Sequence, residues 1–344
     1  MKTEVINNKM KILLTSVFSI ILVIFLMSAI TSCGIQNNQT ASTSVEESST
    51  ALSKSTTKSD ISETSRTTAA TQSDTSMKKE IADIEDIKAE FEVLKEGGSD
   101  PVKNFAFIDA NIKFADTEFA DEMIDFVLQF SESELYPFGD KYANAEIQQK
   151  LWTDFNGTTD LEILKNADDE IISKLARETI DRRYKLEGIE GYISPIIDYE
   201  SYKSYGMFLS KEMNSFIEIM AFESESSSIM DGAVVIPLDD FAVRIIKLYE
   251  FEEEYPGFIR IYYIVNMLNG KLWVYMGGID NTPVFNFENN AIIQERLDNF
   301  KANAEKYKGT RFGDKLAEYI ELLKAENYKR TQKVSDYIDN LTFY

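Results

Sequence analysis

The amino-acid sequence predicts a mainly α-helical, multi-helix globular body with one small β-hairpin or ordered loop near 184–200. Three observations support this fold class. Apolar residues recur at three- and four-residue intervals over most of the chain beyond residue 77, which is the period of a helix packed on one face. Glycine and proline stand at the ends of these stretches. Strand and helix patterns do not alternate, so the two α/β lobes of a transporter's solute-binding protein are disfavoured.

The first predicted helices lie between residues 81 and 183. One apolar stripe ends at the glycine pair 97–98, and Ser99-Asp100-Pro101 marks the next helix start, with proline in the first turn. Residues 159–162 have the spacing of a capping box that begins at Thr159. A further helix is expected over about 168–183. The residues expected to face the core are Ile81, Ile84, Ile87, Phe91, Leu94, Phe119, Met123, Phe126, Phe130, Ile171, Ile172 and Leu175.

Two segments interrupt this rhythm. Residues 184–200 contain two glycines, a proline and β-branched residues, which favours a short hairpin or an ordered loop between two helical halves. Residues 258–278 are open to two interpretations, because Asn269-Gly270 is typical of a hairpin turn while the apolar residues share one helical face. We expect a helix here, starting at Pro256 and ending at Gly277-Gly278. Its face consists of Ile261, Val265, Leu268, Leu272 and Tyr275.

Three further helical stripes occupy the C-terminal part. They consist of Ile293, Leu297 and Phe300; Phe312, Leu316, Tyr319 and Leu323; and Val334, Tyr337 and Leu341. The two tryptophans, Trp152 and Trp273, lie in helical patterns, so we interpret them as core residues and not as platforms for a ligand.

Charge and residue types exclude several classes of function. The formal net charge is −22, and residues 77–344 account for it with 52 acids and 30 bases. Such an acidic surface repels nucleic acids and anionic lipid headgroups. Residues 301–344 are an exception, with nine bases and seven acids. Because the chain has no histidine and a single cysteine, Ser–His–Asp triads, Cys–His pairs, histidine-ligated zinc and disulfide frameworks are excluded, and we expect no cofactor.

The N-terminus has the order of a targeting signal. Three lysines in residues 1–11 precede a nearly continuous apolar run over 12–30, and Ile30-Thr31-Ser32-Cys33 follows. This ending resembles the lipobox of bacterial lipoproteins, although Thr31 is less usual than alanine or serine at its position. The resemblance implies that residues 1–32 are a signal peptide removed by signal peptidase II. It also implies that Cys33 carries a diacylglycerol group, which anchors the chain in the extracytoplasmic face of the cell membrane. The alternative is a retained signal-anchor helix with an incidental cysteine.

A polar segment follows this cysteine. Residues 34–76 hold 21 serines and threonines in 43 positions, with no aromatic residue and no proline. Because such a segment buries little apolar area, we expect residues 33–76 to form a disordered tether. Its end-to-end distance as a flexible coil is about 35–40 Å. The remaining residues, 77–344, form the expected ectodomain, with a subdivision near 184–200 left open.

Acidic residues near the predicted hairpin are the candidate catalytic groups. A glycosidase needs two carboxyl groups about 5–10 Å apart, flanked by aromatic platforms for sugar rings. Tyr192, Tyr199, Tyr202 and Tyr205 are interleaved with the acids and would supply such platforms. The alternative interpretation is that these are solvated loop acids in an acidic domain. The four candidates are Glu187, Glu190, Asp198 and Glu200.

A second acidic group comprises Asp239-Asp240 and the glutamates at 250 and 252–254. No calcium-loop pattern accompanies it, and the glutamate run is expected to end a helix, so no dedicated metal site is predicted. The body also resembles uncharacterised helical ectodomains of lipoproteins from Gram-positive bacteria. That resemblance rests on Glu190-Gly191-Tyr192, Pro195, Ile197-Asp198-Tyr199 and the Asn-Thr-Pro at 281–283, and it implies no known activity.

Three functional hypotheses remain. The first is a non-catalytic, membrane-anchored cell-envelope lipoprotein whose ectodomain binds an envelope protein or a cell-wall component. The second is a carboxylate-dependent hydrolase of cell-wall glycan that uses the acids in 187–200. The third is a substrate-binding or chaperone-like accessory protein, for which a contiguous apolar groove would be the structural sign. No nucleic-acid partner is expected.

Overall fold

The computed structural model describes residues 70–97, 100–189 and 191–341. The chain divides into two units, residues 1–81 and 82–344. The helices and strands named below belong to the second unit, except for the first turns of one helix. The apolar run at 12–30, Cys33 and most of the predicted tether lie outside the described residues. Helix α2 (Ala70–Gly97) starts six residues before the predicted end of the tether at residue 76.

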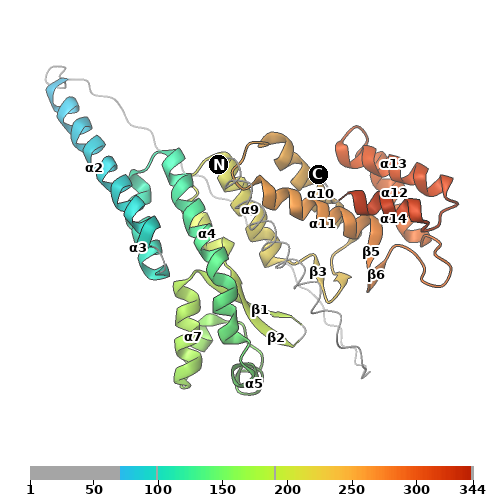
Figure 1. Ribbon diagram of the computed structural model, residues 1–344, viewed down its shortest axis with the longest axis horizontal. Helices are drawn as coiled ribbons and strands as arrows, with labels where there is room; N and C mark the ends of the chain where they lie inside the picture. Colours follow the sequence, from blue (N-terminus) through green and yellow to red (C-terminus); the bar gives the residue numbers. More distant parts are fainter. Residues whose placement is uncertain (1–69, 98–99, 190, 342–344) are drawn as a thin grey trace, which may run out of the picture. The chain divides into compact units, whose positions relative to one another are not determined.

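The body is mainly α-helical, as the sequence predicts (Figure 1). Thirteen α-helices lie within the described part of the chain, joined by three two-stranded antiparallel hairpins. After α2, the first half contains α3 (Pro101–Asn111), α4 (Thr117–Tyr142), α5 (Ala145–Thr153), α6 (Leu161–Lys165), α7 (Glu170–Asp181), β1 (Tyr184–Ile189), β2 (Tyr192–Ile197), α8 (Tyr199–Tyr202) and α9 (Lys211–Glu225).

The second half contains β3 (Ile229–Met230), β4 (Ala233–Val234), α10 (Leu238–Glu254), α11 (Ile261–Gly277), β5 (Gly278–Ile279), β6 (Thr282–Pro283), α12 (Gln294–Lys306), α13 (Arg311–Ala325) and α14 (Gln332–Asn340). Among the described residues, no helix has the length and apolar character needed to cross a membrane.

Polar side chains begin most of these helices. Asp100 caps α3, and Pro101 occupies its first turn as predicted. The predicted cap at Thr159 is wrong by one residue, because the carboxylate of Asp160 accepts the N–H groups of Glu162 and Ile163 at the start of α6. An aspartate carboxylate is at least as good an N-cap acceptor as a threonine hydroxyl, so either residue type fits this position.

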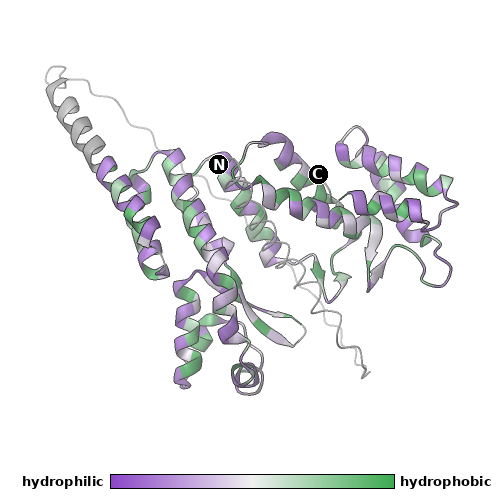
Figure 2. Ribbon diagram, in the orientation of Figure 1, coloured by the Kyte–Doolittle hydropathy of each residue, from purple (hydrophilic) through white to green (hydrophobic). Residues whose placement is uncertain are grey.

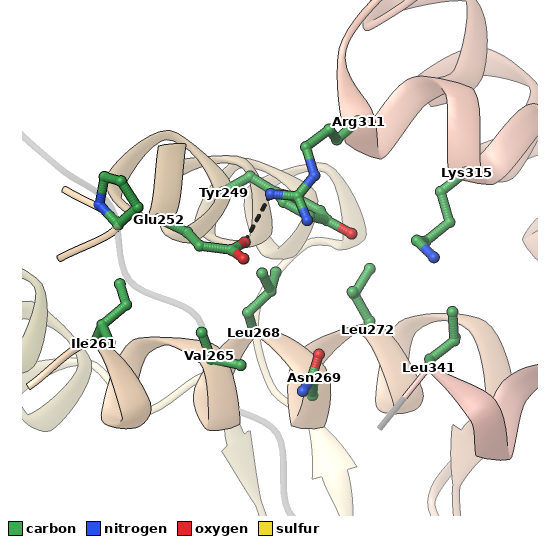
Figure 3. A pocket seen from close by; sticks show the side chains of 11 residues that line it. Tyr249, Glu252, Ile261, Val265, Leu268, Asn269, Leu272, Arg311, Lys315 and Leu341 are labelled. Carbon is green, nitrogen blue, oxygen red and sulfur yellow. Dashed lines mark hydrogen bonds and ion pairs between the residues drawn. The ribbon is translucent and has the colours of Figure 1, made fainter. Parts of the chain in front are cut away.

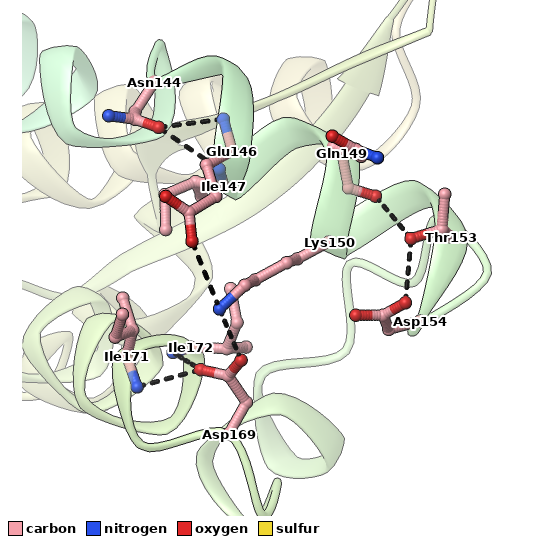
Figure 4. A network of polar contacts seen from close by, with 10 residues as sticks. All are labelled: Asn144, Glu146, Ile147, Gln149, Lys150, Thr153, Asp154, Asp169, Ile171 and Ile172. Carbon is pink, nitrogen blue, oxygen red and sulfur yellow. Dashed lines mark hydrogen bonds and ion pairs between the residues drawn. The ribbon is translucent and has the colours of Figure 1, made fainter.

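The caps of α5 and α7 belong to one polar network (Figure 4). Asn144 caps α5, and the Asp169 carboxylate accepts the N–H groups of Ile171 and Ile172 at the start of α7. Lys150 of α5 donates to Asp169 at 2.7 Å, and this hydrogen bond lowers the pKa of the Asp169 carboxyl. The network therefore joins the two helix starts.

The predicted helical stripes supply the core, with two exceptions. Figure 2 shows hydrophobic and hydrophilic residues interleaved along the helices. The four residues of the stripe that begins at Phe312 are all buried. Ile171, however, is 54% exposed, because successive helix positions are turned by about 100° and Ile172 takes the inward direction. Trp152 is 41% exposed, and its ring packs directly against Gly157 instead of entering the core.

The structure shows the conformation of the two segments that interrupt the helical pattern. Residues 184–189 and 192–197 form the strands of the hairpin β1–β2, in register from the pair Tyr184–Ile197 to the pair Ile189–Tyr192. Residues 261–277 form helix α11, so the helical interpretation is confirmed and the Asn-Gly pair lies inside the helix. The predicted start at Pro256 is wrong, because turns over 256–260 come between this proline and the helix. Gly278 ends α11 with φ +83°, and a Cβ there would lie 2.6 Å from the Val284 nitrogen, so only glycine fits this turn.

Candidate functional site

The hairpin register separates two of the predicted catalytic acids. Glu187 pairs with Ser194, and the Asp198 N–H donates to the Arg183 carbonyl, so both side chains lie on one face. The two pairs are four residue steps apart, which corresponds to about 13 Å between the two Cα atoms along the hairpin. Lys185 lies between them on the same face and acts on the pKa of both carboxyl groups, so this lysine separates the two acids along the face.

The electrostatics of this face are those of two half-buried acids. Burial raises the pKa of the Glu187 carboxyl, and nearby Lys185 opposes that rise. Burial likewise raises the pKa of Asp198. Lys185, which lies between them along the face, is ion-paired with Glu225 at 3.1 Å. The face is therefore an acidic surface with one shared lysine.

The other predicted members of that site do not join it. Glu200 is exposed and pairs with Lys203 at 2.6 Å, while Glu190 lies outside the described residues. The predicted aromatic platforms are mostly core residues, because Tyr199, Tyr202 and Tyr205 are 7%, 0% and 4% exposed. Tyr192 is 40% exposed, and its strand position places it on the same face as Glu187 and Asp198. One accessible ring therefore accompanies the two acids, and the expected group of several accessible rings is not found among the described residues.

The second acidic group is split between the two ends of one helix. Asp239 and Asp240 lie in the first turn of α10, and the glutamates lie in its last turns, about 16 Å away along the axis. Asp239 accepts hydrogen bonds from the side-chain amides of Asn299 and Asn303 at 2.9 and 3.0 Å. Within the described part of the chain, no three acidic side chains are grouped so as to hold a metal ion.

A buried charge cluster joins α9, α10 and α11. Glu223 pairs with Lys271 at 2.8 Å and with Arg244 at 3.1 Å, and all three side chains are at most 14% exposed. Burial lowers the pKa of the Lys271 ammonium, and the Glu223 carboxylate opposes that change. A single carboxylate is therefore the counter-ion of two buried cations.

Lys271 also donates to Ser228 Oγ at 2.6 Å. This is the distance between a general base and the serine that it activates. Ser228 is 3% exposed and does not line the cavity between α10, α11 and α13. A substrate carbonyl therefore has no path to its hydroxyl in this structure. We therefore interpret the cluster as an electrostatic link between three helices.

A cavity of about 400 Å³ lies between α10, α11 and α13 (Figure 3). Its apolar wall is the α11 face that the sequence predicts, and side chains from successive turns of this helix point into the space. Val265 and Ile261 are half-buried there, while Leu268 and Leu272 are buried deeper. The size and apolar wall are those of a small-molecule site. The apolar residues of the cavity are Ile261, Val265, Leu268, Leu272 and Leu341.

The opposite edge of the cavity is charged. Arg311 and Lys315 project from consecutive turns of α13. The Arg311 guanidinium pairs with Glu252 of α10 at 2.8 Å and lies over the Tyr249 ring. Within the described residues, the Lys315 ammonium makes no hydrogen bond or ion pair. The cavity thus combines an apolar wall with one neutralised and one unpaired cation.

Sequence reasoning missed this cavity, although part of its signal was present. Both cations belong to residues 301–344, a segment with nine bases and seven acids in an otherwise strongly acidic body. No protein-family model, curated protein or solved structure matches the chain. The function of the cavity is therefore inferred from its geometry alone.

Proposed function

We propose that this protein is a lipid-anchored, extracytoplasmic binding protein whose helical body holds a small ligand in the cavity between α10, α11 and α13. The observation that carries the proposal is the open apolar face of α11 opposite a charged edge. This is the contiguous apolar groove expected of a substrate-binding accessory protein. The lipobox resemblance at Cys33 and the Ser/Thr-rich segment after it support the anchored location.

Hydrolysis of cell-wall glycan is not favoured by the geometry. Lys185 lies on the same face between Glu187 and Asp198 and opposes the rise in the pKa of both carboxyl groups, whereas a general acid needs a raised pKa. Tyr199, Tyr202 and Tyr205 are buried in the core, and Tyr192 is the one exposed ring of the four predicted platforms. Binding is the function that needs only the features present at the cavity.

Filling the cavity tests the binding proposal. Val265→Phe adds a ring to the apolar wall, so the affinity for a ligand with an apolar body is expected to fall at least about tenfold. The measurement is calorimetric titration of the full chain in lipid nanodiscs with three soluble probes: 4-phenylbutanoate, 4-phenylbutanamide and 4-phenylbutylamine. Empty nanodiscs supply the baseline.

The matched control is Val243→Phe, at a 37%-exposed position of α10 outside the cavity. This variant should bind like the wild type. The proposal fails if the wild-type chain binds none of the three probes, or if both valine variants bind as tightly as the wild type.

The anchor has its own test. Cys33→Ala removes the thiol to which the diacylglycerol group would be attached, so incorporation of a labelled fatty acid is expected to be lost and the precursor to accumulate uncleaved. Metabolic labelling followed by immunoprecipitation measures both effects. Ser32→Ala, which leaves the thiol and a small residue beside it, should still be labelled. Labelling that persists in Cys33→Ala would show that the cysteine is incidental.

A further inference from the structure

We infer that the ligand of the cavity is a monoanionic carboxylate with an apolar body, and that Lys315 binds its carboxylate. This inference rests on the proposed function and specifies the chemical class of the ligand. The apolar body would lie on the α11 face formed by Val265 and its neighbours one and two turns away. The head group would lie at the charged edge on α13.

Lys315 differs from the other cation at the edge by having no partner among the described residues. Arg311 is held by the Glu252 carboxylate at 2.8 Å and approaches Glu253 at 3.8 Å, so its charge is already neutralised. Lys315 is half-buried and lies on the next turn of the same helix, where its side chain points into the cavity. An ammonium without a counter-ion among the described residues attracts an anion, and this attraction is stronger beside an apolar wall than in open water.

The charges at the edge select a single negative charge. Among the side chains that line the cavity, Arg311 and Glu252 cancel, which leaves Lys315 as the one net charge there. A monoanion would neutralise it, whereas a dianion would leave one negative charge close to the Glu252 carboxylate. Glu253 approaches Arg311 from outside this lining and adds a negative charge, which disfavours a dianion further. A cationic head group would repel Lys315 and would have only Glu252, already bound by Arg311, as a partner. A neutral head group would leave the ammonium unpaired.

The same edge already shows how a carboxylate is held. The Glu252 carboxylate lies between α10 and α13 at hydrogen-bond distance from Arg311, directly above the apolar wall. Positions i and i+4 of a helix are neighbours, so the Lys315 stem emerges beside that of Arg311. A second carboxylate would fit beside the first, with its alkyl or aryl body directed toward Leu268 and Leu272 on α11.

The experiment compares head groups on one apolar body. The wild-type chain in nanodiscs is titrated with 4-phenylbutanoate, 4-phenylbutanamide and 4-phenylbutylamine. We expect the carboxylate to bind about tenfold more tightly than the amide and the amine to bind most weakly. Lys315→Met should remove the preference for the carboxylate while leaving the affinity for the amide unchanged. Lys315→Arg should keep the preference.

The matched control is Lys301→Met, which removes an exposed lysine of α12 outside the cavity that has no ion pair within the described ranges, and which changes the net charge equally. It should bind the probes like the wild type. Equal affinity for carboxylate and amide, or a carboxylate preference that survives in Lys315→Met, would overturn the inference while leaving the binding function intact. Failure of all three probes to bind would overturn both.

Discussion

Replacing Glu223 by glutamine is expected to lower the free energy of unfolding by about 3–5 kcal/mol, the cost of leaving buried charges without a counter-ion. Glu223 is the one carboxylate between Lys271 and Arg244, whose side chains are 7% and 6% exposed. Glutamine keeps the shape and accepts one hydrogen bond, so the loss reports charge and not packing. Urea unfolding followed by tryptophan fluorescence measures it.

Removing one of the two cations should have a much smaller effect. Lys271→Met leaves the Glu223–Arg244 pair balanced and replaces the lysine stem by a side chain of similar length. The expected loss is about 1 kcal/mol, because the Ser228 hydroxyl loses its partner. If Lys271→Met lowers the free energy of unfolding as much as Glu223→Gln does, the charge argument is wrong.

The effect of Glu223→Gln should depend on pH in a defined direction. Burial lowers the pKa of Lys271, so the unfolded chain binds more protons than the folded one between that lowered pKa and the ordinary value of 10.5. Stability from this group therefore rises with pH across that window. The variant removes the carboxylate that opposes the lowering, which widens the window. Its deficit relative to the wild type should consequently be smaller at pH 10 than at pH 7.

Gly313→Ala is expected to lower the free energy of unfolding by about 3 kcal/mol, the upper end of the usual cost of overpacking. Gly313 lies in the first turn of α13 and donates its N–H to the capping Thr310 hydroxyl at 3.2 Å. An added Cβ would overlap the backbone carbonyl of Tyr307, and a backbone group cannot move aside as a side chain can. Thermal or urea unfolding of the variant provides the test.

Gly270→Ala is the matched comparison. Gly270 lies inside α11 at an exposed position, and an added Cβ there would meet nothing within 4 Å. Alanine should therefore raise the free energy of unfolding by up to about 1 kcal/mol, the difference in helix propensity. The two substitutions should have opposite signs, and a loss at both positions would indicate that the close approach at Gly313 is not responsible.

Much of the secondary structure could be predicted from local patterns. The stripe from Phe312 to Leu323 identified α13, because four residues one turn apart must lie on one face. The same periodicity decided in favour of the helix at 261–277 against an Asn-Gly turn signal. Local patterns failed where neighbouring residues were equivalent candidates, as with Thr159 and Asp160 for one cap, or Ile171 and Ile172 for one inward position.

The candidate site could be predicted only in part. The apolar wall of the cavity was visible as a helical face, and the excess of bases over acids near the C-terminus was visible in the composition. Neither showed that α13 would bring Arg311 and Lys315 opposite that wall. The acids near the hairpin were predicted as a site because they are close in sequence. The strand register determines their separation, and it places Glu187 and Asp198 four residue steps apart along the hairpin.

The sequence by itself determined most helical faces and a chemistry without histidine or intrachain disulfides, because these depend on residue types and on neighbours a few positions apart. The targeting segment over residues 1–32 stays a prediction from the same kind of pattern. Only the tertiary structure decided which charges meet. Glu223, Arg244 and Lys271 come from three different helices, and Lys315 has no partner within the part of the chain that the structure describes. Such contacts depend on how distant helices pack, which no local pattern encodes.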